Sequence, residues 1–108
     1  MNAEYAARLY IKALIFRVSG EEYRGHSIRV LLGFLASLLE EKGLQEMAAQ
    51  IADYSRNNRR VLAELEEGHI RSVYGVLEYS EEQAKKLVNA AESLIRFLEK
   101  IEEGVFPA

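Results

Sequence analysis

The segment from Ser55 to Gly75, with the sequence SRNNRRVLAELEEGHIRSVYG, contains five of the chain's arginine and histidine side chains. Arginine and histidine held close together can cleave RNA, with the histidine as general base and the arginine beside the phosphate. The same side chains can instead form an ordinary solvated helix face, because Glu64 and Glu67 are interleaved with the arginines. The spacing of these residues along a helix is the first test between the two interpretations.

On a single helix through this segment, the step of about 100° per residue divides the candidates between two faces. Asn58 and His69 share the apolar, inward stripe, whereas Arg56 and Arg60 point to the opposite side. A compact arginine–histidine site is therefore not expected, and binding is favoured over catalysis. The candidate nucleotide- or RNA-binding residues are Asn58, Arg59, Arg60, His69, Arg71 and Tyr74.

The rest of the chain offers no recognisable catalytic or metal-binding pattern. With two histidines and no cysteine, a zinc site is not expected. The chain has no phosphate-binding glycine loop. His26 directly precedes a predicted helix, where a capping or loop-packing role is the simplest interpretation. We predict neither a metal nor a cofactor, and we assign no catalytic residue.

Length and composition indicate one globular domain spanning residues 1–108. Hydrophobic residues make up 49% of the chain and charged residues 29%, and the net charge of −3 is unlike that of a strongly basic nucleic-acid binder. No uncharged apolar run reaches the roughly 18 residues of a membrane span. The absence of cysteine and of a signal-peptide pattern at the N-terminus fits a cytoplasmic protein.

Apolar periodicity predicts an all-α fold, an up-and-down bundle of four helices. A bend is expected at Gly68, inside the third helix. Ser80 and Gln83 form a capping box for the last helix. The predicted helices run from about Ala3 to Val18, from His26 or Ser27 to Lys42, from Gln45 to the region of residues 68–75, and from Ser80 past Ile101.

The first two predicted helices are apolar over far more than one face. In the first, Glu4, Arg8 and Lys12 form one narrow polar stripe that can hold a Glu4–Arg8 ion pair, and nearly every other position is apolar. A helix of this kind must be surrounded by other elements. We therefore expect a helix from another chain to complete the bundle, most simply in a homodimer.

Four short motifs follow one another in order over most of the chain. Lys12-Ala13-Leu14 ends a helix rich in small residues, and His26-Ser27 follows in the loop. Ser80-Glu81-Glu82 begins the last helix, and Ala90-Ala91-Glu92 lies within it. In this order and spacing the chain resembles the HEPN domain family (higher eukaryotes and prokaryotes nucleotide-binding), which implies a helical fold and a link to nucleotides or RNA.

The chain departs from the family pattern in two places. Members of the family usually carry another amphipathic helix ahead of the segment that matches NAEYAARLYIKAL. Its absence means that the start codon is misassigned, that the chain has been shortened, or that a partner supplies the packing. The second departure concerns activity. Members that lack the nuclease motif often keep Arg-Tyr-Pro near the end of the long helix, and only Tyr74 of that motif is kept here.

The nuclease motif itself is also missing. Ribonuclease members carry an arginine followed by a histidine after four to six intervening residues. Ahead of His69, positions 62–64 hold Leu, Ala and Glu; ahead of His26, positions 19–21 hold Ser, Gly and Glu. No catalytic residue can therefore be transferred from the family.

The leading hypothesis is a non-catalytic HEPN-like binding module that forms a homodimer. By resemblance, its partner is a minimal nucleotidyltransferase, as in two-gene toxin–antitoxin pairs. One alternative is a divergent metal-independent ribonuclease that uses His69 with Arg71 or Arg60 across a dimer interface. Another is a purely structural helix donor for a larger complex.

Overall fold

The computed structural model describes residues 3–74 and 81–107, with the backbone alone described for residues 68–74. Within these residues it contains five α-helices and no strand, so the all-α prediction is confirmed. The predicted cap Ser80 lies outside the described residues. No helix in these ranges is long and apolar enough to cross a bilayer. The helices are α1 (Ala3–Ser19), α2 (Ile28–Glu41), α3 (Gln45–Asn57), α4 (Arg59–Tyr74) and α5 (Glu81–Val105).

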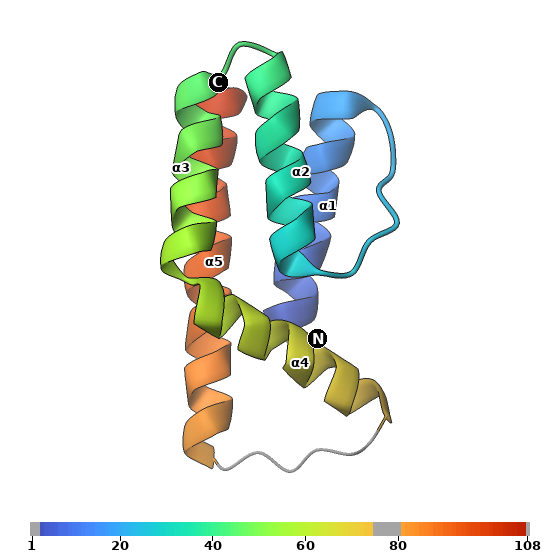
Figure 1. Cartoon of the computed structure of the whole chain (residues 1–108), viewed down its shortest axis with the longest axis vertical. Helices are drawn as coiled ribbons and strands as arrows, with labels where there is room; N and C mark the ends of the chain where they lie inside the picture. The colour runs from blue at the N-terminus through green and yellow to red at the C-terminus, as the bar shows by residue number, and fades with distance from the viewer. Residues whose placement is uncertain (1–2, 75–80, 108) are drawn as a thin grey trace.

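The helix directions differ from the predicted up-and-down order (Figure 1). Helices α1, α2 and α5 run in one direction and α3 runs in the other, while α4 crosses obliquely at the end of the bundle where α1 begins. The two first helices are parallel because residues 20–27 form an extended segment that leads the chain back along α1 before α2 starts. A helical pattern alone does not reveal such a return.

The returning segment 20–27 is held by an aromatic contact. The Tyr23 ring stacks on the Phe34 ring of α2, with 4.6 Å between the centroids. A Cβ atom at Gly25 would lie 2.4 Å from Cε1 of Tyr23, so the stacked ring needs a glycine beside it. Gly20, with φ of 75°, turns the chain out of α1. These contacts fix the path of the segment.

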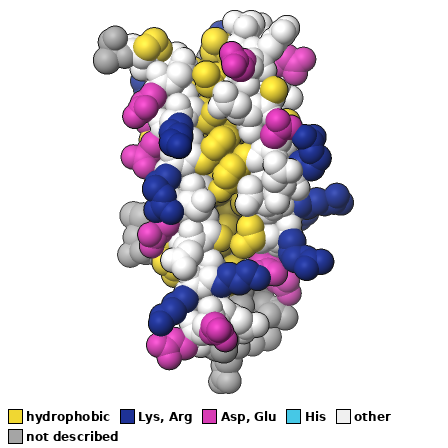
Figure 2. Space-filling view, turned by 90° about the vertical axis from the view of Figure 1, so that its left-hand side faces the viewer, with side chains coloured by type: hydrophobic (Ala, Val, Ile, Leu, Met, Phe, Trp, Pro, Cys, Tyr) yellow, Lys and Arg dark blue, Asp and Glu magenta, His cyan; other side chains and the backbone are white. Residues whose placement is uncertain are grey.

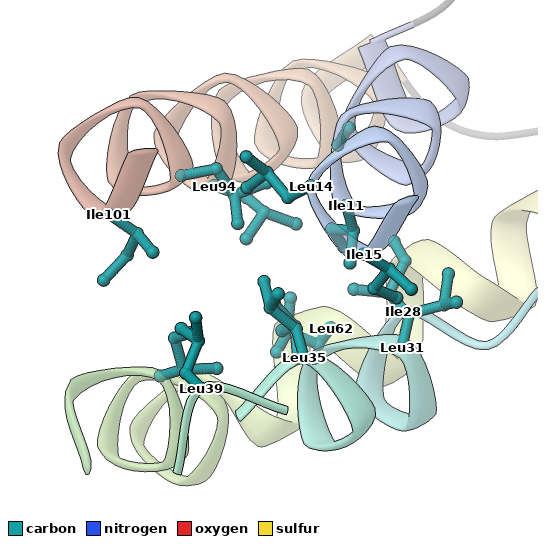
Figure 3. Close-up of a cluster of buried hydrophobic side chains, with 14 of the residues drawn as sticks. Ile11, Leu14, Ile15, Ile28, Leu31, Leu35, Leu39, Leu62, Leu94 and Ile101 are labelled. Carbon is teal, nitrogen blue, oxygen red and sulfur yellow. The ribbon is translucent and has the colours of Figure 1, made fainter. Parts of the chain in front are cut away.

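All five helices contribute to one buried core, part of which is shown in Figure 3. Leu35 and Leu39 of α2 lie opposite Leu94 and Ile101 of α5, and α4 adds Leu62. The largest fully buried side chains are Ile11, Ile15, Ile28, Leu31, Leu32, Leu35, Leu39, Ile51, Leu62, Leu94, Leu98 and Ile101.

Helix α1 buries polar side chains and exposes apolar ones. The predicted Glu4–Arg8 ion pair is present at 3.6 Å, and Arg8 is only 3% exposed. Tyr5, Leu9 and Phe16 are instead 43%, 42% and 52% exposed. One chain by itself therefore does not cover α1 on most sides. The exposed apolar face formed by Tyr5, Leu9 and Phe16 is available to another molecule.

Helices α3 and α5 meet along an aromatic seam. The Tyr54 and Phe97 rings are nearly parallel, with 4.1 Å between their centroids. Toward the far end of the seam the Met47 side chain covers Gly104, where a Cβ atom would lie 2.7 Å from Cε of Met47. Figure 2 shows hydrophobic side chains on this side of the molecule, between rows of charged ones.

Candidate functional site

Most of the sequence-predicted site residues lie on α4. The predicted single helix from Gln45 onward is in fact two helices, since α3 ends at Asn57 and α4 begins at Arg59. The bend is thus ten residues earlier than the one expected at Gly68, which lies within α4. Because the two helices run in different directions (Figure 1), Asn58 and His69 do not belong to one continuous stripe.

Asn58 forms the junction between the two helices. Its backbone N–H donates a hydrogen bond to the Tyr54 carbonyl at 3.0 Å, and its side-chain amide donates to the same carbonyl at 2.9 Å. The Asn58 carbonyl then accepts the first hydrogen bond of α4, from Leu62 N at 2.9 Å. Asn58 therefore ends one helix and starts the next, and its amide group already has a structural partner.

The position of α4 is fixed by Glu66 at the N-terminus of α2. The Glu66 carboxylate accepts hydrogen bonds from the Ser27 hydroxyl at 2.8 Å and from Arg29 N at 2.8 Å. The Arg29 guanidinium donates to it through Nη2 at 2.9 Å and through Nε at 3.2 Å. A carboxylate in this place also interacts favourably with the positive end of the α2 dipole.

Two opposing effects determine the pKa of Glu66. Burial raises the pKa of this carboxyl, but hydrogen bonds from Arg29 and Ser27 and the Arg29 charge outweigh burial and hold it below its usual value. Glu66 therefore stays ionised at neutral pH and remains bound to α2. The sequence left His26 and Ser27 as alternatives for the start of α2, and the structure has Ser27 as the N-cap. The role of Glu66 was not predicted.

The arginines of the opening segment have different surroundings. Arg56 forms an ion pair with Asp53, one turn earlier on α3. Arg59 and Arg60 are exposed in the first turn of α4, which contains no acidic residue. Neither makes an ion pair within the part of the chain that the structure describes. The ion pair of Arg56 with Asp53 fits the interpretation of a solvated helix face with mixed charges. Arg59 and Arg60, by contrast, remain available to an anion.

The other candidates lie toward the end of α4 or beside α1. His69, Arg71 and Tyr74 belong to α4, but their side chains are outside the described residues. His26 is exposed and lines an open groove between α1 and segment 20–27, together with Lys12 and other residues. His26, the only histidine whose side chain the structure describes, shares this groove with Arg17 and Arg24.

A second polar cluster joins the first and last helices. The Tyr10 hydroxyl donates a hydrogen bond to Oε1 of Glu102, and Arg17 binds the other oxygen at 2.6 Å. Arg17 also lies over the Phe106 ring, 3.9 Å from its centroid. Burial, followed by the hydrogen bond to Glu102 and that residue's charge, raises the pKa of Tyr10 to about 12. This tyrosine stays protonated at neutral pH.

Comparison with known proteins gives one match. The sequence model of the HEPN domain matches residues 1–101, nearly the whole chain. No curated protein and no solved structure matches it. The five-helix, strand-free arrangement of the described residues agrees with the all-α fold of that family. Because the match extends over far more than half of the sequence, the chain belongs to the HEPN domain family.

Proposed function

We propose that this HEPN domain is a non-catalytic interaction module that works as a cytoplasmic homodimer. The observation that carries the proposal is the exposed apolar face of α1, formed by Tyr5, Leu9 and Phe16. These side chains recur at helical spacing and are 42–52% exposed. Large apolar side chains that gather on one exposed helix face of a small domain often mark an interface.

The non-catalytic part of the proposal is supported by the missing nuclease spacing. No arginine precedes His69 or His26 with four to six residues in between. Its family membership supports a minimal nucleotidyltransferase as the protein partner in a toxin–antitoxin pair. We place nucleotide or RNA contacts, where they occur, on α4 at Arg59, Arg60, His69, Arg71 and Tyr74.

Light scattering coupled to gel filtration tests the dimer. We expect the wild-type chain to have twice the monomer mass, and Phe16→Lys combined with Leu9→Lys to give a folded monomer. Gln50→Lys is the matched control, because Gln50 is exposed on α3, a helix that does not contact α1. A wild-type monomer, or a double variant that remains dimeric, would contradict the proposal.

Incubation of the purified protein with a mixture of RNAs tests the absence of catalysis. We expect no cleavage above a buffer control, with or without EDTA. Cleavage that is abolished by His69→Ala would instead support the alternative ribonuclease, which uses His69 with Arg71 or Arg60. The dimer and nuclease assays are independent, so each part of the proposal can fail by itself.

A further inference from the structure

An open groove of about 820 Å³ runs between α2 and α3, on a part of the surface that the α1 interface does not include. The two helices are antiparallel and joined by a short turn (Figure 1). The small residues that line it include Gly33, Ala36, Ser37, Ala49 and Ala52. None of the described residues that line it is aromatic.

One end of this α2–α3 groove is basic, and the other carries a single acidic residue, Glu40. Arg29 from α2, Arg56 from α3 and Arg59 from α4 line the same end. Glu40 and Gln45 line the opposite end, next to the turn. Arg29 and Arg56 are paired with carboxylates of the chain, whereas Arg59 makes no ion pair among the described residues.

The place of Arg59 is electrostatically unfavourable in the isolated domain. Arg59 and Arg60 occupy the first turn of α4, near the positive end of the helix dipole, and no acidic residue in that turn compensates them. Cations at this position are disfavoured, while an external carboxylate is favoured. The basic end of the groove is therefore suited to an anionic group from another molecule.

Gly33 gives an independent observation. It lies in the middle of α2 without a positive φ, and a Cβ atom there would meet nothing within 4 Å. A glycine inside a helix costs about 1 kcal/mol relative to alanine. Nothing among the described residues requires this glycine. Without a side chain at Gly33, the backbone of another molecule can approach the groove closely, which would explain why a glycine stands there.

From these observations we infer that the α2–α3 groove binds an α-helix of a partner protein, whose carboxylates lie at its basic end, over Arg59. A floor of small side chains lets a helix approach closely, and the charges at the basic end select an acidic segment. Single-stranded RNA fits less well, since the groove offers no ring on which bases could stack.

The choice of a partner helix over a second copy of this chain rests on the proposed dimer through α1. Two different self-complementary interfaces on one chain lead to assemblies larger than a dimer. A groove that remains open in a closed dimer is suited to a different protein. A homodimer formed through α1 would then have two equivalent docking grooves, one on each chain.

A pair of labelled peptides of roughly 18 residues, about 27 Å when helical, provides the probe. Both are stapled as helices with alanine and leucine on one face, and they differ only in carrying glutamate or lysine in the last two turns. Fluorescence anisotropy measures their binding to the full chain. We expect the glutamate peptide to bind and the lysine peptide to bind at least tenfold more weakly.

Three variants assign the binding to the groove. Gly33→Leu and Arg59→Glu should each weaken binding of the glutamate peptide about tenfold. Lys100→Glu, the same charge reversal at an exposed position of α5 outside the groove lining, should leave it unchanged. Gly33→Ala should raise the melting temperature, because a Cβ atom at this position meets nothing within 4 Å. Circular dichroism checks that Gly33→Leu is folded before its binding is measured.

Several results would overturn the inference. These are equal binding of both peptides, binding of neither, or binding that Gly33→Leu and Arg59→Glu leave intact. A lower oligomeric mass of Gly33→Leu in light scattering would assign the groove to a second copy instead. Loss of the dimer in the Leu9→Lys, Phe16→Lys variant with peptide binding retained would leave the groove independent of the α1 interface.

Discussion

At the scale of single residues, Glu66 is the clearest organising contact. It binds Ser27 and Arg29, which lie 39 and 37 residues earlier in the chain. Hydrogen bonds to a charged acceptor are stronger than neutral ones, and this carboxylate accepts several of them. Removing its charge should loosen the attachment of α4 to α2 more than it disturbs either helix.

We predict that Glu66→Gln lowers the free energy of unfolding by about 1–3 kcal/mol at neutral pH. The pKa of Glu66 is lowered in the folded state, so its contribution is complete above the usual glutamate pKa of about 4.3 and is lost as the pH falls through the folded-state value. Urea titrations near pH 7 and pH 3 measure this. Glu103→Gln, an exposed control, should change stability little, and an equal loss in both variants would contradict the assigned role.

Local sequence signals identified one side of this contact only. A serine before an apolar run predicts an N-cap, and Ser27 accepts a hydrogen bond from Val30 N at 3.2 Å as such a cap does. Glu66, by contrast, looks like any other acidic residue of an exposed helix face. Its role depends on the crossing of two helices, and helical periodicity contains no information on crossing angles.

At the scale of elements, the break at Asn58 matters most, because it redirects the chain that carries the candidate binding residues. The apolar stripe was predicted to continue from Ile51 through Leu62 and Leu65, and all three are buried. The sequence has neither proline nor glycine at the break, so the pattern predicted one helix. What it could not show is that an asparagine amide would compete for the Tyr54 carbonyl.

Asn58→Ala tests whether this residue is structural or binds a ligand. The substitution removes the hydrogen bond from the side-chain amide to the Tyr54 carbonyl, so we expect a loss of about 1 kcal/mol in unfolding free energy. Asn57→Ala, at the exposed neighbouring position, serves as the control. Unchanged stability in Asn58→Ala would argue against the junction role and return Asn58 to the ligand-binding candidates.

At the scale of the whole molecule, the family, the helical class and most helix boundaries followed from the sequence, whereas the arrangement of the helices did not. Apolar spacing identifies which residues face inward, as at Leu94 and Leu98, but not what they face. The exposed side of α1 illustrates the difference. Its excess of apolar residues was visible in the sequence, and the structure identifies Tyr5, Leu9 and Phe16 as the uncovered ones.

The Tyr10–Glu102 contact joins the ends of the chain and gives an alkaline signature. Because the pKa of Tyr10 is about 12 in the folded state and about 10 in an unfolded chain, unfolding is accompanied by proton release in this range. Stability should therefore fall between about pH 10 and pH 12. Tyr10→Phe should remove that slope while costing about 1 kcal/mol at neutral pH. An unchanged slope, measured by urea unfolding, would contradict this assignment.

The pairing of α1 with α5 has a consequence for synthesis. Helix α1 is made first, yet the side of it that holds Tyr10 and Arg17 contacts Glu102, which is 92 and 85 residues further along the chain. During translation the Glu102 contact cannot form until α5 has left the ribosome. A nascent chain paused before α5 would display this surface, which makes it a natural binding site for chaperones.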